Sequence, residues 1–353
     1  MSVTVPSYVY TYIKIGFLKK LVMSKEEIDE LENFTEIKEL ISYIKPFFPD
    51  IKIDEYTIEE IEKSLYHIYI KLIGRIISVS PENMREFLRD YLLKYEILNI
   101  RNLILASIIG LSREEKRANV NFLVEEYLEK RDFIEGLINI STLDEIQLYM
   151  RNTMYNRVVR EGITYFRNND EIFVLEAFLD KLYYENLIRL EISFNKHERA
   201  MIPIYISILT EIYNLNILYR GIINSIDKKL LNQFLVENYL FLEEEDINLL
   251  LEQTTPENYF AILNQKLSQN KDFKDIFKKI EYRSRNPISE LEELYRTYYF
   301  RKFKQQIDNI DYTTIYSILE VLIKKEKEIT NHIIPNIVRI VHRKFDIFED
   351  IMA

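Results

Sequence analysis

Residues 87–104 read Phe-Leu-Arg-Asp-Tyr-Leu-Leu-Lys-Tyr-Glu-Ile-Leu-Asn-Ile-Arg-Asn-Leu-Ile, and they contain the pattern Glu96-Ile97-Leu98-Asn99. Glu-Ile-x-Asn occurs at two other places, Glu211–Asn214 and Glu328–Asn331, so the copies begin 115 and 117 residues apart. A Leu-Tyr pair precedes each copy by a similar distance, at Leu65-Tyr66, Leu182-Tyr183 and Leu294-Tyr295. Two features that recur in the same order at the same interval predict three related modules, each about the size of one small domain.

The length of the repeat determines what kind of module to expect. Helical arrays of short repeats have periods of roughly 33–47 residues, well below this interval. The sequence therefore predicts three multi-helix modules, each with its own core, at residues 1–115, 116–235 and 236–353. Because the chain has no Gly/Ser-rich linker, we expect the modules to pack against one another, and three similar modules would suit a pseudo-threefold arrangement around an axis.

The composition predicts an all-α fold. Only 6 Gly and 8 Pro interrupt the 353 residues, and helix-start signals such as Thr57-x-x-Glu60 and Ser112-x-x-Glu115 precede apolar residues at helical spacing. No sustained alternation of apolar and polar residues marks a strand. Long helices joined by short connections follow from this pattern.

Several classes of function are disfavoured by what the sequence lacks. It has no Cys, no glycine-rich phosphate loop and no His in a metal-binding spacing, so we predict no catalytic residue, no cofactor and no metal site. The net charge of −10 argues against a nucleic-acid partner. No apolar run approaches the roughly 20 residues of a membrane-spanning helix, so we expect no transmembrane segment. The absence of Cys leads us to expect an intracellular location.

The repeated polar residues are the candidate functional residues. Glu and Asn three positions apart share one face of a helix, and their neighbours are strongly apolar. Buried carboxylates and amides need hydrogen-bond partners, so these side chains either brace helices inside the protein or line a socket for a partner. The candidates are Glu96, Asn99, Glu211, Asn214, Arg220, Glu328 and Asn331.

These segments together resemble a known family. The stretch 87–104, the pair Leu179-Asp-Lys-Leu-Tyr-Tyr184 and Glu211-Ile-Tyr-Asn-Leu-Asn-Ile-Leu-Tyr-Arg220, and Ile318-Leu-Glu-Val-Leu-Ile-Lys-Lys-Glu-Lys-Glu-Ile-Thr-Asn331 are similar to repeats of the C subunit of the A/V-type ATPases. That protein is the counterpart of the d subunit of the eukaryotic vacuolar proton pump. The chain departs from the family after Asn331, where Pro335 is expected to kink or end the last helix.

The resemblance implies a non-catalytic rotor part, shaped as a funnel of three modules around a central cavity. Such a protein lies at the cytoplasmic face of the membrane on the ring of proteolipid subunits, and it receives the D and F subunits of the central stalk. It would thereby link ATP hydrolysis or synthesis to the translocation of protons or sodium ions. The alternative is a static helical scaffold or adaptor without rotary partners.

Overall fold

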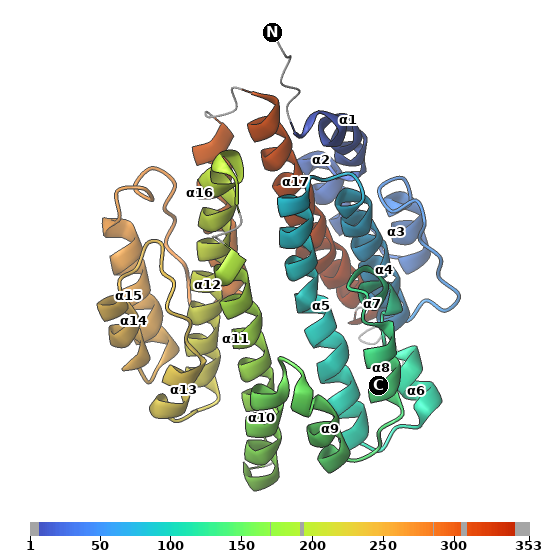
Figure 1. The fold of residues 1–353 in the computed structure, drawn as a ribbon. Helices are drawn as coiled ribbons and strands as arrows, with labels where there is room; N and C mark the ends of the chain where they lie inside the picture. The colour runs from blue at the N-terminus through green and yellow to red at the C-terminus, as the bar shows by residue number, and fades with distance from the viewer. Residues whose placement is uncertain (1–6, 170, 191–193, 285, 305–308, 343–353) are drawn as a thin grey trace, which may run out of the picture. The chain divides into compact units, whose positions relative to one another are not determined.

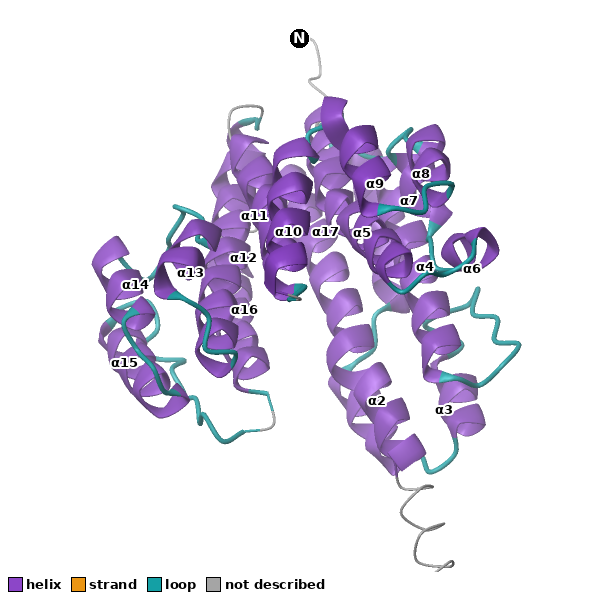
Figure 2. Ribbon diagram, turned by 90° about the horizontal axis from the view of Figure 1, so that it is seen from below, coloured by secondary structure: helices purple, strands orange, loops and turns teal. Residues whose placement is uncertain are grey.

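The structure, a computed structural model, describes residues 7–169, 171–190, 194–284, 286–304 and 309–342. Within these residues every regular element is a helix and no strand occurs (Figure 2). The all-α prediction is therefore confirmed. The outer ends of the predicted first and third modules, residues 1–6 and 343–353, lie outside the described residues.

The chain forms two compact units. The first comprises Met1–Leu88, Asn121–Tyr127 and Ile307–Ala353, and the second comprises Arg89–Val120 and Leu128–Gln306. The boundary falls within helix α5 (Glu82–Ile108), which contributes to both units. The division into three modules at residues 115 and 235 stays a prediction.

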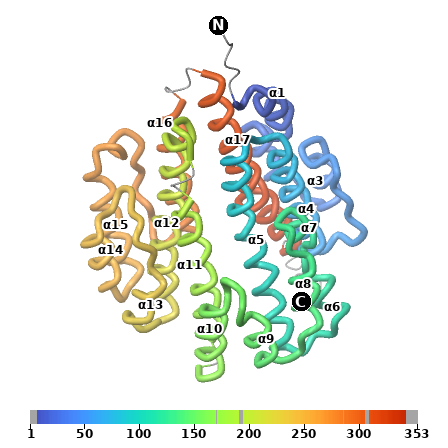
Figure 3. The backbone as a smooth tube through the Cα atoms, in the orientation of Figure 1, coloured from blue at the N-terminus to red at the C-terminus, as the bar shows by residue number. Residues whose placement is uncertain are grey.

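The first unit brings the two ends of the chain together. Its helices are α1 (Val9–Leu18), η1 (Lys19–Leu21), α2 (Lys25–Glu30), η2 (Leu31–Asn33), α3 (Ile37–Ile44), α4 (Ile58–Ile77), α7 (Phe122–Tyr127), α17 (Ile310–Lys327) and η5 (Glu328–Ile333). Helix α17 packs against α1 and α4, so red and blue segments lie side by side in the tube drawing (Figure 3). The core of this unit is thus shared between residues some 250–300 positions apart, as in the hydrogen bond from Tyr69 to the Leu322 carbonyl oxygen at 3.1 Å.

The second unit contains the remaining helices. They are the rest of α5, then α6 (Arg113–Ala118), α8 (Arg131–Ile138), α9 (Leu143–Tyr149), η3 (Met150–Asn152), α10 (Asn156–Asn169), α11 (Phe173–Arg189), α12 (Lys196–Ile223), α13 (Lys228–Phe234), α14 (Glu244–Leu251), α15 (Pro256–Gln269) and α16 (Pro287–Lys304). Helix α12 is in contact with four other helices of this unit, α11, α13, α15 and α16 (Figure 1).

Local sequence signals explain where several helices begin and how tightly they pack. Ser112 and Thr142 cap α6 and α9 with complete capping boxes, which satisfy the free backbone N–H groups of the first turn. Gly162 lets α10 approach α11 closely, because a Cβ there would lie 2.8 Å from the Cα of Leu175. Gly110 takes a φ of +76° just after α5, the left-handed conformation that often ends a helix.

The chain stays helical through Pro335. A π-helical turn, η5, precedes the proline, and residues 334–342 continue as helix. A proline interrupts the regular ladder of backbone hydrogen bonds, and a wider turn is one way in which a helix absorbs such an interruption. The helix therefore does not end at Pro335, and a π-helical turn lies before it at the third Glu-Ile-x-Asn copy.

Helix α12 is long and apolar enough, by length and composition, to cross a membrane. Two observations favour a core helix instead. Of its most apolar window, 67% is buried inside the protein, and Glu211 and Asn214 on this helix bind backbone groups of the same unit. A lipid-facing helix would have no reason to bury a carboxylate and an amide in this way.

Candidate functional site

The carboxylate of the second motif copy is fully buried and holds a loop. Glu211 on α12 accepts hydrogen bonds from the backbone N–H groups of Leu240 at 2.5 Å, Phe241 at 3.0 Å and Leu242 at 3.3 Å. The hydroxyl of Tyr295 on α16 donates to its other oxygen. Burial raises the pKa of Glu211, and the four donors act in the opposite direction by stabilising the anion. The side chain therefore joins α12, the loop after α13, and α16.

The amide of the same copy holds the same loop one turn further along. Asn214 donates to the Val236 carbonyl oxygen at 2.8 Å and accepts from the Val236 N–H at 2.9 Å, so both groups of one peptide residue are bound. Asn264 on α15 repeats this two-way contact with Ile280 at 2.9 Å and 2.8 Å. A side-chain amide both donates and accepts, so it can supply the two hydrogen bonds that the backbone of a non-helical residue needs when no neighbouring strand is present.

The third copy carries a buried ion pair. Glu328 lies 2.7 Å from the Nζ atom of Lys325 and accepts from the Met23 N–H at 2.7 Å, and both side chains are at most 2% exposed. Lys325 also donates to the Leu21 carbonyl oxygen at 2.7 Å. Burial lowers the pKa of Lys325 to about 8, against the opposing effect of Glu328. The pair fixes the segment after α1 to the end of α17.

The first copy uses a side chain rather than backbone as its partner. Glu96 on α5 is fully buried, and Lys130 approaches its two oxygens at 3.1 Å and 2.8 Å from a position that is 35% exposed. Asn99, one turn on, is also buried. Asn331 of the third copy is partly buried and accepts from the Thr330 hydroxyl at 2.8 Å. The three Glu residues of the motif are therefore all buried and all bound within the chain.

The partners follow one order along the chain. Glu96 meets Lys130, 34 residues later, and Glu211 meets Leu240–Leu242, 29 to 31 residues later. Glu328 meets Met23 near the other end of the chain. In terms of the predicted modules, each carboxylate binds an early segment of the next module, and the third binds an early segment of the first.

Arg220 belongs to a polar cluster formed by three helices. It lies 3.3 Å from Glu176 on α11 and stacks its guanidinium over the Phe173 ring at 4.7 Å. Arg101 on α5 reaches the other oxygen of Glu176 at 3.6 Å. Sequence reasoning missed Arg101 and Glu176, because neither recurs at the motif spacing. The available signal was the spacing of Glu176 and Asp180, which lie four residues apart and therefore share one face of a helix.

Asp180 is the member of this cluster whose pKa is shifted. Burial raises its pKa to about 6, while nearby Arg101 lowers it and Glu176 raises it. Its field is in turn one of the causes that raise the pKa of Tyr213, after burial of the Tyr213 hydroxyl itself. Tyr213 donates to the carbonyl oxygens of Ala177 at 3.0 Å and Phe234 at 3.1 Å, so it acts as a brace.

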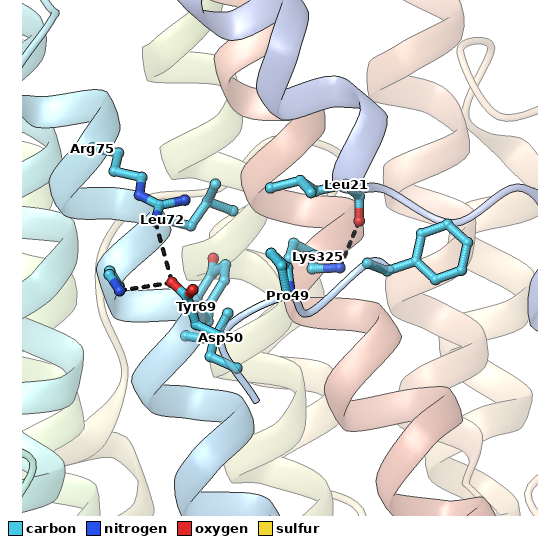
Figure 4. A pocket seen from close by; sticks show the side chains of 10 residues that line it. Leu21, Pro49, Asp50, Tyr69, Leu72, Arg75 and Lys325 are labelled. Atoms are coloured by element: carbon cyan, nitrogen blue, oxygen red, sulfur yellow. Dashed lines mark hydrogen bonds and ion pairs between the residues drawn. The ribbon is translucent and has the colours of Figure 1, made fainter. Parts of the chain in front are cut away.

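A small cavity lies in the first unit between α4, α17 and the segment after α3 (Figure 4). Its charged groups are paired: Asp50 lies 2.6 Å from Lys71 and 3.2 Å from Arg75, and Lys325 is held as described above. Apolar side chains, among them Leu72 and Pro49, form much of the remaining wall. The cavity gives no arrangement of a nucleophile with a base. Among the described residues, no group of three or more acidic or His side chains is placed to hold a metal ion.

Comparison with known proteins finds matches that cover most of this chain. The model of the family described as ATP synthase (C/AC39) subunit matches residues 14–334. The C subunit of the A-type ATP synthase of Methanosphaera stadtmanae is 24% identical over 282 residues, which cover 76% of this chain and 71% of that protein. The protein of the same name from Methanocaldococcus jannaschii is 25% identical over 63% of this chain and 56% of its own length.

A longer match extends over nearly the whole chain. The C subunit of the A-type ATP synthase of Pyrococcus furiosus is 22% identical over 325 residues, or 91% of this chain and 84% of that protein. The family match begins within α1 and runs through η5, so it includes all three copies of the Glu-Ile-x-Asn pattern. A match of this extent shows that the chain belongs to the ATP synthase (C/AC39) subunit family.

Proposed function

We propose that this chain is a non-catalytic coupling subunit of a rotary A/V-type ATPase, a collar between the central stalk and the membrane ring of proteolipid subunits. It would transmit torque, so that ATP hydrolysis or synthesis is linked to the translocation of protons or sodium ions. The family match supports membership of such a complex, and the named relatives are C subunits of A-type ATP synthases. The collar role itself, the cytoplasmic position, and partnership with the D and F subunits of the stalk belong to the proposal.

The observation that carries the proposal is the placement of the motif carboxylates. Glu96, Glu211 and Glu328 are each at most 1% exposed, and each connects its helix to a distant segment of the chain. Braces of this kind resist deformation, because breaking one leaves a buried charge without its partner. A rotor part that transmits torque needs this stiffness, whereas a catalytic centre needs accessible groups.

The order of the braces supports a closed set of three modules. Each helix that carries a Glu-Ile-x-Asn copy also contacts the helix that carries the Leu-Tyr pair of the following predicted module. Arg101 on α5 reaches Glu176 on α11, Glu211 on α12 binds Tyr295 on α16, and Leu322 on α17 accepts from Tyr69 on α4. The third contact returns to the first module. A cyclic head-to-tail order is what a pseudo-threefold funnel with a central cavity requires.

The proposal is tested by purification of the tagged chain from its native membranes in mild detergent. We expect proteolipid and stalk subunits to co-purify, and we expect the isolated chain to have no ATPase activity. Recovery of the chain from membranes without either class of subunit would favour the static scaffold instead. ATP turnover by the purified chain that an acidic-residue substitution abolishes would favour an enzyme.

A further inference from the structure

Helix α1 has one face that is buried and one that is exposed to solvent. Thr11 and Ile15 on its inner face are buried against the first unit, where α1 packs on α17 and α4. The opposite face carries Tyr10, Ile13 and Phe17, which are 60%, 56% and 63% exposed. Residues at i, i+3 and i+7 form a continuous stripe, so these three apolar side chains make a single outer face of α1.

This outer face is bordered by lysines. Lys14 places its Nζ atom 5.6 Å from the centre of the Tyr10 ring, and Lys20 places its own 5.7 Å from the centre of the Phe17 ring. The first 24 residues contain three lysines and no acidic residue, in a chain whose net charge is −10. The face therefore combines exposed aromatic rings with a local positive charge.

The two acidic residues of α17 that contact the α1 region are bound away from Lys14 and Lys20. Asp311 on α17 accepts a hydrogen bond from the Tyr8 N–H at 3.2 Å. Glu320, also on α17, is 17% exposed and lies 2.8 Å from Lys19 and 2.7 Å from Lys324. Both acids are thus engaged on the inner side, whereas Lys14 and Lys20 lie beside the exposed rings.

From this arrangement we infer that the outer face of α1 binds the surface of a membrane that contains anionic phospholipid. Tyr, Phe and Ile enter the boundary between headgroups and acyl chains, and lysines beside them meet lipid phosphates. The lysine ammonium groups and aromatic rings are complementary to that boundary in both charge and polarity. The inference goes beyond the proposed function, because it places lipid itself, and not only proteolipid subunits, in contact with this chain.

The chain has no Trp, which allows a site-specific test. In Phe17→Trp the only indole lies on the outer face of α1. In Leu148→Trp it lies at a similarly exposed position on α9, where the native leucine is 69% exposed. The probes are vesicles of phosphatidylglycerol with phosphatidylcholine, and vesicles of phosphatidylcholine alone. We expect a blue shift and quenching by brominated lipid for Phe17→Trp with the anionic vesicles, and neither for Leu148→Trp.

Substitutions then show which side chains contribute to vesicle binding. Tyr10→Ser with Phe17→Ser is expected to lower partitioning onto anionic vesicles by more than about tenfold, since each exposed ring would otherwise be buried in the boundary. Lys14→Glu with Lys20→Glu is expected to lower it by at least about tenfold, and added salt should have the same direction of effect. Ile109→Ser, at a 69% exposed position outside α1, is the matched control and should change nothing.

Three outcomes would overturn the inference. One is the absence of binding to anionic vesicles by a chain with a native circular dichroism spectrum. Another is equal fluorescence change in the α1 and α9 reporters, which would mean non-specific adsorption. The third is that the α1 variants bind vesicles normally but no longer retain the other subunits during purification, which would identify the occupant as a protein. Loss of vesicle binding with retention of those subunits would leave the proposed function intact and support the lipid contact.

Discussion

The Tyr295 hydroxyl on α16 donates a hydrogen bond to the Glu211 carboxylate on α12, across 84 residues of sequence. One residue belongs to the third Leu-Tyr pair and the other to the second Glu-Ile-x-Asn copy. At this contact the two repeated features, which sequence analysis treats as separate marks of each module, meet between two consecutive predicted modules.

Tyr295→Phe removes this donor and leaves the rest of the ring in place. We expect the free energy of unfolding to fall by about 2 kcal/mol, the usual effect of a lost hydrogen bond to a buried charged group. Urea unfolding measures the change. Tyr282→Phe is the matched control. The Tyr282 hydroxyl accepts a hydrogen bond from Arg283, and this hydrogen bond is exposed to solvent. Equal effects of the two substitutions would contradict the assignment.

Asn214→Ala removes both hydrogen bonds to Val236. We expect the Val236 amide to exchange its hydrogen much faster, together with a loss of about 2 kcal/mol in the free energy of unfolding. Amide hydrogen exchange followed by mass spectrometry resolves the position. Asn264→Ala serves as the matched variant, since it should expose the Ile280 amide and leave Val236 protected. Exchange that rises uniformly in both variants would argue against local braces.

Glu328→Gln leaves the Lys325 ammonium buried beside the Leu21 carbonyl oxygen without a counter-charge. We expect a loss of about 3 kcal/mol in the free energy of unfolding, because an uncompensated buried charge is costly. The double variant Lys325→Met with Glu328→Gln should recover most of it. Thermal or urea unfolding of the double-mutant cycle gives the coupling energy, and additive single effects would show that the two groups do not interact.

Asp180→Asn tests the polar cluster through pH. Burial raises the folded-state pKa of Asp180 to about 6, above the value of about 3.9 in an unfolded chain. The folded form therefore binds the proton more tightly, and this contribution to stability is present below pH 4 and lost as the pH rises through 6. The variant should gain about 3 kcal/mol relative to the native chain at pH 8 and much less at pH 4. Unfolding curves at the two pH values measure this difference in stability. A gain of equal size at both would contradict the raised pKa of Asp180.

How much of this could be predicted from the sequence depends on whether contacts are local. The helical fold follows from scarce Gly and Pro and from capping boxes such as Ser112-x-x-Glu115, which operate within one turn. The burial requirement of Glu211 and Asn214 follows from their apolar neighbours. Their partners do not, because Leu240–Leu242 and Tyr295 reach them only after several helices have packed.

Other parts of the site lacked any sequence signal. Met23 contributes only its backbone N–H to Glu328, and every residue except proline has such a group. Glu176 and Arg101 carry no repeated spacing, although they complete the environment of Arg220. The π-helical turn at Glu328–Ile333 and the helix that continues beyond Pro335 were likewise not predicted, since a proline alone indicates a kink or an end.

The most direct test of the central claim is the number of ions translocated per ATP hydrolysed by the intact membrane complex, with and without this chain. We expect complexes that lack it to hydrolyse ATP without pumping ions, and re-addition of the native chain to restore pumping. An unchanged ratio of ions moved to ATP consumed in complexes shown to lack the chain would contradict the claim that it couples the two.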